Sequence, residues 1–277
     1  MEARGRAVVL AHHPWPWSKT RRYLDAPVRG SLAARLTPYT SIEDRCGTSR
    51  LISVPVLPSK PIGGPRPWAE GGTAAYHITH VENLASIVAC GQIECDNDCA
   101  EAARNPIGIA HTDLKEQRAR TSVTVAAGGT LADYVPFYFA PRSPMLISIH
   151  RGYVEQYDGG QDAIVHLVCS VQGLAKLGRF AVINRHPITA LAEQFDDLAA
   201  LADLDWTIMR AKYWSDTDED GDRKFRRQAE FLVHRSVPIE AIKLVGAATD
   251  AVAHRAATLL EGMPDPPPVI VRRDWYY

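Results

Sequence analysis

The feature that most constrains the fold of this chain is a series of short runs rich in aromatic and β-branched residues. Such runs are typical of β-strands that pack at least one face into a core. Short helical patterns separate some of them, but no regular strand–helix–strand repeat appears. We therefore predict an α+β fold with a mixed β-sheet rather than a doubly wound one. The predicted strands are AAYHIT (74–79), YVPFYFA (134–140), MLISIH (145–150), IVHLVCSV (164–171), FAVIN (180–184) and AEFLVHRSV (229–237).

The predicted helices are fewer than the strands. Apolar residues recur at helical spacing from near His80 to a stop at Gly91. Residues 188–214 are predicted to be helical, and residues 111–121 form either a short basic helix or an irregular loop. Residues 215–226 are predicted to be an acidic, solvated loop, and the stretch PPPVIV (266–271) contains a short strand near the end.

The first 72 residues differ in composition from the rest. Prolines at 58, 61, 65 and 67 forbid regular structure, so we expect a linker over 58–72. Residues 1–57 are predicted to be weakly ordered, with a possible strand over Leu51–Leu57, and the globular body spans 73–277. A misassigned start codon would also explain the composition of this N-terminal extension.

Charge is distributed unevenly. Residues 1–70 hold 11 Lys and Arg against 5 Asp and Glu, whereas the remainder holds 20 against 27. Bulk charge therefore does not indicate a nucleic-acid binder, and any such binding must use a local basic patch or the N-terminal arm.

Several classes of protein are excluded by missing patterns. No dinucleotide-binding, P-loop, zincin or G-x-S-x-G signature occurs. The cysteines at 90, 95 and 99 lack the paired C-x2-C spacing of structural zinc sites, so we expect free thiols and no metal. No run of about 20 apolar residues exists, and the N-terminus is a poor secretory signal, so we expect a cytoplasmic protein without a membrane span.

A carboxylate at the head of an apolar run raises the most specific question. Glu230 precedes Phe231–Val233, and an unpaired carboxylate is costly to bury. The residue is therefore exposed at a strand end, paired with a cation, or held for chemistry.

Other candidate residues carry weak signals when each is taken alone. His77 and Thr79 share one face of a predicted strand and are either core residues or ligands of a ribose or amide. Tyr138 lies on the opposite face from its two neighbouring phenylalanines and is able to stack on a planar ring. Arginines in KEQRART (115–121) suit phosphate binding, and INRHP (183–187) places Arg185 and His186 just after a strand.

Taken in order, several blocks resemble the DarT family of DNA-targeting ADP-ribosyltransferase toxins. The blocks are YHITHVENLASIVACGQI, DYVPFYFAPRSPMLISIHRG, INRHP, RQAEFLV and RRDWYY. The likeness covers nearly all of residues 73–277 and none of residues 1–72. It implies a split β-sheet whose cleft holds NAD+, and transfer of ADP-ribose to a base of single-stranded DNA, thymine in the better-matched branch, with release of nicotinamide.

The resemblance also implies roles for single residues. Glu230 falls on the catalytic glutamate, and Arg118 on an arginine that assists deprotonation of the base or fixes its pose. His77 and Thr79 match the strand that grips the nicotinamide ribose and amide, while Asn83 and Tyr138 are expected near NAD+. His186 is expected near the loop that presents DNA. We expect Glu230→Ala to abolish transfer at little cost in stability.

Further expectations concern partners. Arg120, Arg142 and Arg151, with the basic N-terminal arm, are the candidate DNA contacts, and DNA affinity should depend strongly on salt. The family implies an antitoxin of the DarG type that removes ADP-ribose, and we expect a monomer. The alternatives are an enzyme of related fold that uses NAD+ to modify RNA or protein, and a non-catalytic single-strand binding module.

Overall fold

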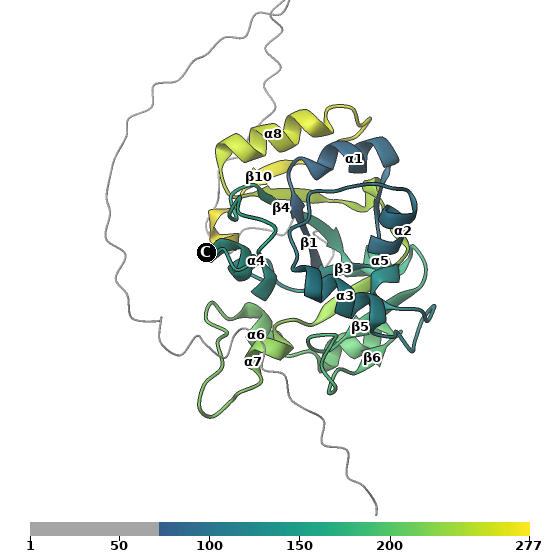
Figure 1. The fold of residues 1–277 in the computed structure, drawn as a ribbon, viewed down its shortest axis with the longest axis vertical. Helices are drawn as coiled ribbons and strands as arrows, with labels where there is room; N and C mark the ends of the chain where they lie inside the picture. Colours follow the sequence, from purple (N-terminus) through teal and green to yellow (C-terminus); the bar gives the residue numbers. More distant parts are fainter. Residues whose placement is uncertain (1–71) are drawn as a thin grey trace, which may run out of the picture. The chain divides into compact units, whose positions relative to one another are not determined.

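The structure is a computed structural model that describes residues 72–277 (Figure 1). The possible strand over Leu51–Leu57 and all of the predicted linker except its last residue lie outside the described residues.

An eight-stranded mixed sheet organises the described part of the chain. Every neighbouring pair of strands is antiparallel except β9 and β10. The α+β prediction is therefore confirmed. In spatial order the strands are β10 (Val269–Val271), β9 (Leu244–Ala247), β4 (Ile164–Ser170), β1 (Ala74–His80), β3 (Tyr134–Tyr138), β7 (Glu230–His234), β5 (Phe180–Ile183) and β6 (Gln194–Phe195).

The centre of this sheet is its weakest connection. Strands β1 and β4 pair along seven residues, and β3 and β7 along five, but β1 and β3 pair only at Tyr76 and Tyr138. The sheet therefore consists of two halves joined at one residue pair. A separate two-stranded sheet joins β2 (Gln92–Glu94) to β8 (Ser236–Pro238). Arg235, with φ of 67°, lies between β7 and β8 and lets the chain turn from one strand into the other.

Helices cover both faces of the sheet (Figure 1). Apolar residues of α1 (Asn83–Cys90) and α8 (Asp250–Leu260) share one core cluster with Phe137, Leu167 and Phe231. On the other face, α4 (Pro144–His150) packs with Trp275 and Tyr276, which lie in and after η5 (Arg273–Trp275). Residues 72–277 therefore have apolar cores on both sides of the sheet.

Three short helices lie near the sites considered below. They are α2 (Asp96–Glu101), α3 (Thr112–Arg120) and α7 (Arg223–Arg226). Helix α3 decides between the two alternatives for residues 111–121 in favour of a helix. The remaining short elements are α5 (Val171–Ala175), η2 (Leu131–Asp133) and η4 (Ile239–Ala241).

Two predicted elements were wrong. Residues 145–150 form helix α4 instead of a strand, because the Ser143 hydroxyl caps the helix and Pro144 occupies its first turn. Residues 188–214 form β6, η3 (Leu198–Asp203) and α6 (Trp206–Arg210) instead of one helix. Asp197 and Asp205 each accept a backbone hydrogen bond and so begin a new short helix. Helix α8 was missed altogether.

The described residues contain no helix that is both long enough and apolar enough to cross a bilayer.

Candidate active site

A buried ion pair lies where β7 begins. Glu230 is 4% exposed, so an exposed strand-end glutamate is the wrong interpretation. Helix α3 brings Arg118 to it from 112 residues away, and Nη1 of Arg118 donates to Oε2 at 3.0 Å and to Oε1 at 3.3 Å. The structure therefore joins the two residues that were expected to be catalytic.

Arg118 retains one unused group beside this carboxylate. Burial lowers the pKa of Arg118, but Glu230, Tyr138 and Asp96 together raise it above its usual value, so the guanidinium stays charged. Its Nη2 is buried and has no hydrogen-bond partner among the described residues. Because buried donors are normally satisfied, this nitrogen is well placed to receive an acceptor from a ligand.

Tyr138 shares a cross-strand row with Glu230. The register pairs Tyr76 with Tyr138 and Tyr138 with Glu230, and directly paired residues project from the same face. Burial raises the pKa of Tyr138, and the Glu230 carboxylate raises it further. The phenol therefore stays neutral at the edge of the ion pair.

His186 approaches the same ion pair from the turn after β5. It is 7% exposed, and its Nδ1 accepts a hydrogen bond from the Ile188 amide at 3.2 Å. Burial lowers its pKa to about 4, with a further contribution from the positive charge of Arg118. His186 is therefore a neutral imidazole near Arg118, not a cation ready to bind phosphate.

His77 and Thr79 form a second group on β1. They alternate with Tyr76, so their side chains leave the strand from the opposite face to the Tyr138–Glu230 row. The Nδ1 of His77 lies 2.9 Å from the carbonyl of Pro136, where β1 and β3 have stopped pairing. Burial lowers the pKa of His77.

Asn83 is occupied by contacts with the protein. Its Nδ2 donates to the Thr79 hydroxyl and to the Ile107 carbonyl, each at 3.0 Å, and its Oδ1 accepts from the Ile107 amide at 2.8 Å. Both amide hydrogens are therefore used, and Asn83 orients Thr79 and the loop before α3.

The Asp96 side chain shows that the Arg118–Glu230 pair and the group of His77 and Thr79 are neighbours. The Asp96 carboxylate, at the start of α2, acts electrostatically on both His77 and Arg118. Asp96 itself pairs with Lys115 of α3 at 3.3 Å. Helices α2 and α3 therefore lie beside the point where β1 and β3 separate.

The three arginines expected to bind DNA are not brought into one patch. Arg120 is exposed and pairs with Glu116 at 3.3 Å, and Arg151 is exposed. The guanidinium of Arg142 stacks on the ring of Tyr277, 4.3 Å from its centroid. Arg120 lies on the helix that carries Arg118, and the Arg142 carbonyl accepts hydrogen bonds from Arg227.

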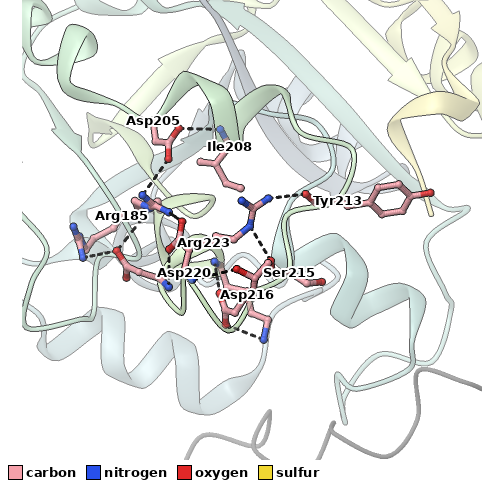
Figure 2. A network of polar contacts seen from close by, with 12 residues as sticks. Arg185, Asp205, Ile208, Tyr213, Ser215, Asp216, Asp220 and Arg223 are labelled. Atoms are coloured by element: carbon pink, nitrogen blue, oxygen red, sulfur yellow. Dashed lines mark hydrogen bonds and ion pairs between the residues drawn. The ribbon is translucent and has the colours of Figure 1, made fainter.

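The segment 215–226, predicted to be an acidic, solvated loop, ends in helix α7, and several of its carboxylates are paired with basic side chains. Figure 2 shows the network around Arg185, Asp205 and Asp216. Asp222 accepts a hydrogen bond from Arg185 at 3.0 Å, Asp205 forms an ion pair with Arg226 at 3.2 Å, and Asp216 forms an ion pair with Lys224 at 3.1 Å. The His186 amide also donates to the Phe225 carbonyl at 2.9 Å. These contacts fix the turn that carries His186 against the segment that leads into Glu230.

The described residues hold no cluster of three His, Cys, Asp or Glu side chains arranged for a metal ion. Cys90, Cys95, Cys99 and Cys169 are free thiols, while Cys46 lies outside the described residues.

Comparison with known proteins gives consistent matches over the described region. The family model for DarT, a ssDNA thymidine ADP-ribosyltransferase, matches residues 76–277. A DNA ADP-ribosyl transferase of Thermus sp. (strain 2.9) is 40% identical over 208 residues, covering 74% of this chain and 96% of the relative. One of Mycobacterium tuberculosis (strain ATCC 25618 / H37Rv) is 28% identical over 226 residues, covering 78% and 94%.

Solved structures agree. Thermus sp. 2.9 DarT in complex with ADP-ribosylated ssDNA matches with a TM-score of 0.69 at 38% identity, covering 74% of this chain and 97% of that chain. The same protein in complex with NAD+ matches with a TM-score of 0.65 at 38% identity, covering 75% and 98%. The split mixed sheet is therefore a fold that these ADP-ribosyltransferases share.

Proposed function

This chain belongs to the DarT family of ssDNA thymidine ADP-ribosyltransferases and is an NAD+-dependent DNA ADP-ribosyltransferase; on that premise, we propose that Glu230 and Arg118 form its catalytic centre. The observation that carries the proposal is the buried ion pair with one guanidinium nitrogen left unused.

NAD+ supplies the ADP-ribosyl group. The bond from C1 of the nicotinamide ribose to the nicotinamide nitrogen breaks, a bond from C1 to a ring nitrogen of thymine forms, and the proton of that nitrogen passes to solvent; neutral nicotinamide leaves with the electron pair of the broken bond. Positive charge develops on the ribose as nicotinamide leaves. Glu230 stabilises this charge electrostatically, and more strongly than in water because the carboxylate is buried.

Arg118 serves the acceptor in this proposal. A thymine ring nitrogen is a poor nucleophile until it is deprotonated, and the negative charge then spreads to the adjacent carbonyl oxygens. The unused Nη2 of Arg118 donates to such an oxygen, which stabilises the anion. Single-stranded DNA exposes the base at little unstacking cost.

The other expected residues receive supporting roles. His77 and Thr79 bind the nicotinamide ribose and amide, Asn83 orients Thr79, and Tyr138 lies by the nicotinamide ring as a neutral phenol. His186 contacts the acceptor strand as a neutral imidazole, and Arg120, Arg142 and Arg151 are the candidate contacts to its phosphates.

The test is mass spectrometry of a short thymine-containing single strand after incubation with NAD+ and either the wild type or Glu230→Gln. We expect the wild type to add one ADP-ribose to a thymine, and Glu230→Gln to add at least about 100-fold less. RNA and a protein mixture serve as parallel acceptors. Transfer to RNA or protein but not to DNA would overturn the acceptor, and an active Glu230→Gln would overturn the catalytic assignment.

Partners follow from the same reaction. We infer that the protein is a monomeric cytoplasmic toxin, opposed by an antitoxin of the DarG type that hydrolyses ADP-ribose from DNA. Expression of the wild type should arrest growth, Glu230→Gln should not, and co-expression of an ADP-ribosyl hydrolase active on DNA should restore growth. Arrest by both forms would instead favour a non-catalytic single-strand binding module.

A further inference from the structure

Arg227 lies three residues before Glu230 and has no assigned role. It is 3% exposed and forms no ion pair with any carboxylate of the described residues. Burial lowers its pKa to about 10, so it remains a cation. Its guanidinium donates only to main-chain carbonyls: Nη1 to Ile208 at 2.5 Å, Met209 at 2.7 Å and Ala211 at 3.3 Å, and Nε and Nη2 to Arg142 at 3.3 and 3.1 Å.

These carbonyls belong to two separate segments. Ile208, Met209 and Ala211 lie at the C-terminal end of α6, where carbonyls lack helical partners and a cation is favoured. Arg142 lies in the turn between β3 and α4. One side chain therefore joins the end of α6, the turn after β3 and the segment that leads into β7.

The position of this junction relative to the sheet is informative. The ladders that pair β7 with β3 and with β5 both end at Glu230, at the pairs Tyr138–Glu230 and Ile183–Glu230, so neither ladder holds the residues that precede Glu230. Beyond the pair Tyr138–Glu230, the bonds from Arg227 to the Arg142 carbonyl continue the connection between the two chain segments. The same carbonyl accepts from the Tyr277 hydroxyl at 3.1 Å, which anchors the turn independently.

We infer that Arg227 is a positioning residue for the reaction, which holds the segment entering β7 so that the Glu230 carboxylate stays opposite Arg118. The inference rests on the proposed role of Glu230. A buried cation without a carboxylate partner is costly, and an apolar side chain would fill the same space without that cost. The five hydrogen bonds explain why a charged side chain is present, because they hold two chain segments in place beside Glu230. Such precision matters for catalysis, since a displacement of about 1 Å at a reacting group costs on the order of 100-fold in rate.

The test compares Arg227→Lys and Arg227→Met with Arg223→Met in the full chain. Arg223 is a matched control, because it also donates to two carbonyls, those of Ser215 at 2.9 Å and Tyr213 at 3.0 Å (Figure 2). Those carbonyls belong to the exposed loop and not to the segments beside Glu230. Initial rates with NAD+ and a single-stranded oligonucleotide give kcat and both KM values, and circular dichroism reports folding.

We expect Arg227→Lys to stay folded and to lose about 10- to 100-fold in kcat, because an ammonium cannot reach both segments at once. Both KM values should stay within about threefold of the wild type, and Arg223→Met should keep wild-type kcat. Arg227→Met should lose at least as much kcat as Arg227→Lys.

Three results would overturn the inference: wild-type kcat in Arg227→Lys, an equal loss in Arg223→Met, or a change confined to KM. If Arg227→Met fails to fold, Arg227→Lys decides alone, and failure of both to fold would make Arg227 a folding residue and refute a positioning role. An inactive Glu230→Gln beside a fully active Arg227→Lys refutes only this inference. An active Glu230→Gln refutes the proposed catalytic centre itself.

Discussion

Glu230 and Arg118 depend on each other electrostatically, and this changes an expectation drawn from the sequence. Arg118 is 9% exposed and has no second carboxylate within ion-pair distance among the described residues. Removing the Glu230 carboxylate would leave the buried guanidinium of Arg118 without a negatively charged partner. The pair therefore contributes to the fold as well as to the proposed chemistry.

We now expect Glu230→Ala to be destabilised by about 3 kcal/mol rather than to keep wild-type stability. The double variant Arg118→Met, Glu230→Ala should recover part of this loss, because it removes the unpaired charge. Urea unfolding of the wild type, both single variants and the double variant measures the coupling. Strictly additive losses would contradict the argument.

His166 makes stability depend on pH. It is fully buried, with Nδ1 3.1 Å from the Tyr276 hydroxyl and Nε2 3.0 Å from the Pro141 carbonyl, and burial lowers its pKa to about 4. Between pH 6.5 and about 4 the unfolded chain binds this proton and the folded chain does not, so stability falls as the pH falls.

The free energy of unfolding of the wild type should fall between pH 7 and pH 5 because of His166. In His166→Gln we expect this fall to be smaller by about 2 kcal/mol. Urea unfolding at the two pH values measures this difference. The pKa values of His77 and His186 are also lowered by burial, and because both proteins retain these residues, their contributions cancel in the comparison. An identical pH dependence in the two proteins would show that His166 is not buried in neutral form.

At the scale of elements, the sequence predicted most strands but could not place their partners. Runs such as 164–171 and 180–184 are unambiguous because aromatic and β-branched residues make up half or more of them. MLISIH carries the same residue types, and its helix depends on the cap from Ser143 instead. The pairing of Arg118 with Glu230 was not predictable from spacing, since only the tertiary packing of helix α3 brings two residues 112 positions apart together. The resemblance supplied both residues, but not their contact.

Gly246 shows how closely the C-terminal segment packs on the sheet. A Cβ atom at this position would lie 2.3 Å from Cζ3 of Trp275. Strand β9 is paired on both sides here, with His166 of β4 and Ile270 of β10, so the backbone cannot move away.

We expect Gly246→Ala to be destabilised by about 1–3 kcal/mol, through overpacking against the indole ring. Thermal unfolding followed by circular dichroism measures the effect. Gly108→Ala is the matched control, because a Cβ there meets no atom within 4 Å. Equal midpoints for the two variants would show that Trp275 does not pack on Gly246.

At the scale of the whole molecule, charge separates the N-terminal extension from the family domain. Residues 1–72 carry six more basic than acidic residues, whereas residues 73–277 carry seven more acidic than basic ones. The family match covers only residues 76–277. The two parts are therefore expected to contribute differently to DNA binding and to chemistry.

We expect residues 73–277 alone to retain ADP-ribosyl transfer but to bind single-stranded DNA more weakly than the full chain. The slope of log affinity against log salt concentration should be shallower for the shorter protein, since it neutralises fewer phosphates. Fluorescence anisotropy with a labelled oligonucleotide at several salt concentrations measures both quantities. Equal slopes would exclude the extension from DNA binding.

The single residue pair between β1 and β3 has a mechanical consequence. The proposed donor contacts His77 and Thr79 stand on one half of the sheet, and Glu230 stands on the other. With one pair as the joint, the angle between the halves is compliant, and few main-chain hydrogen bonds resist its change. A dinucleotide that contacts both halves would restrict the angle between them, so the sheet would be more rigid with NAD+ bound than without it.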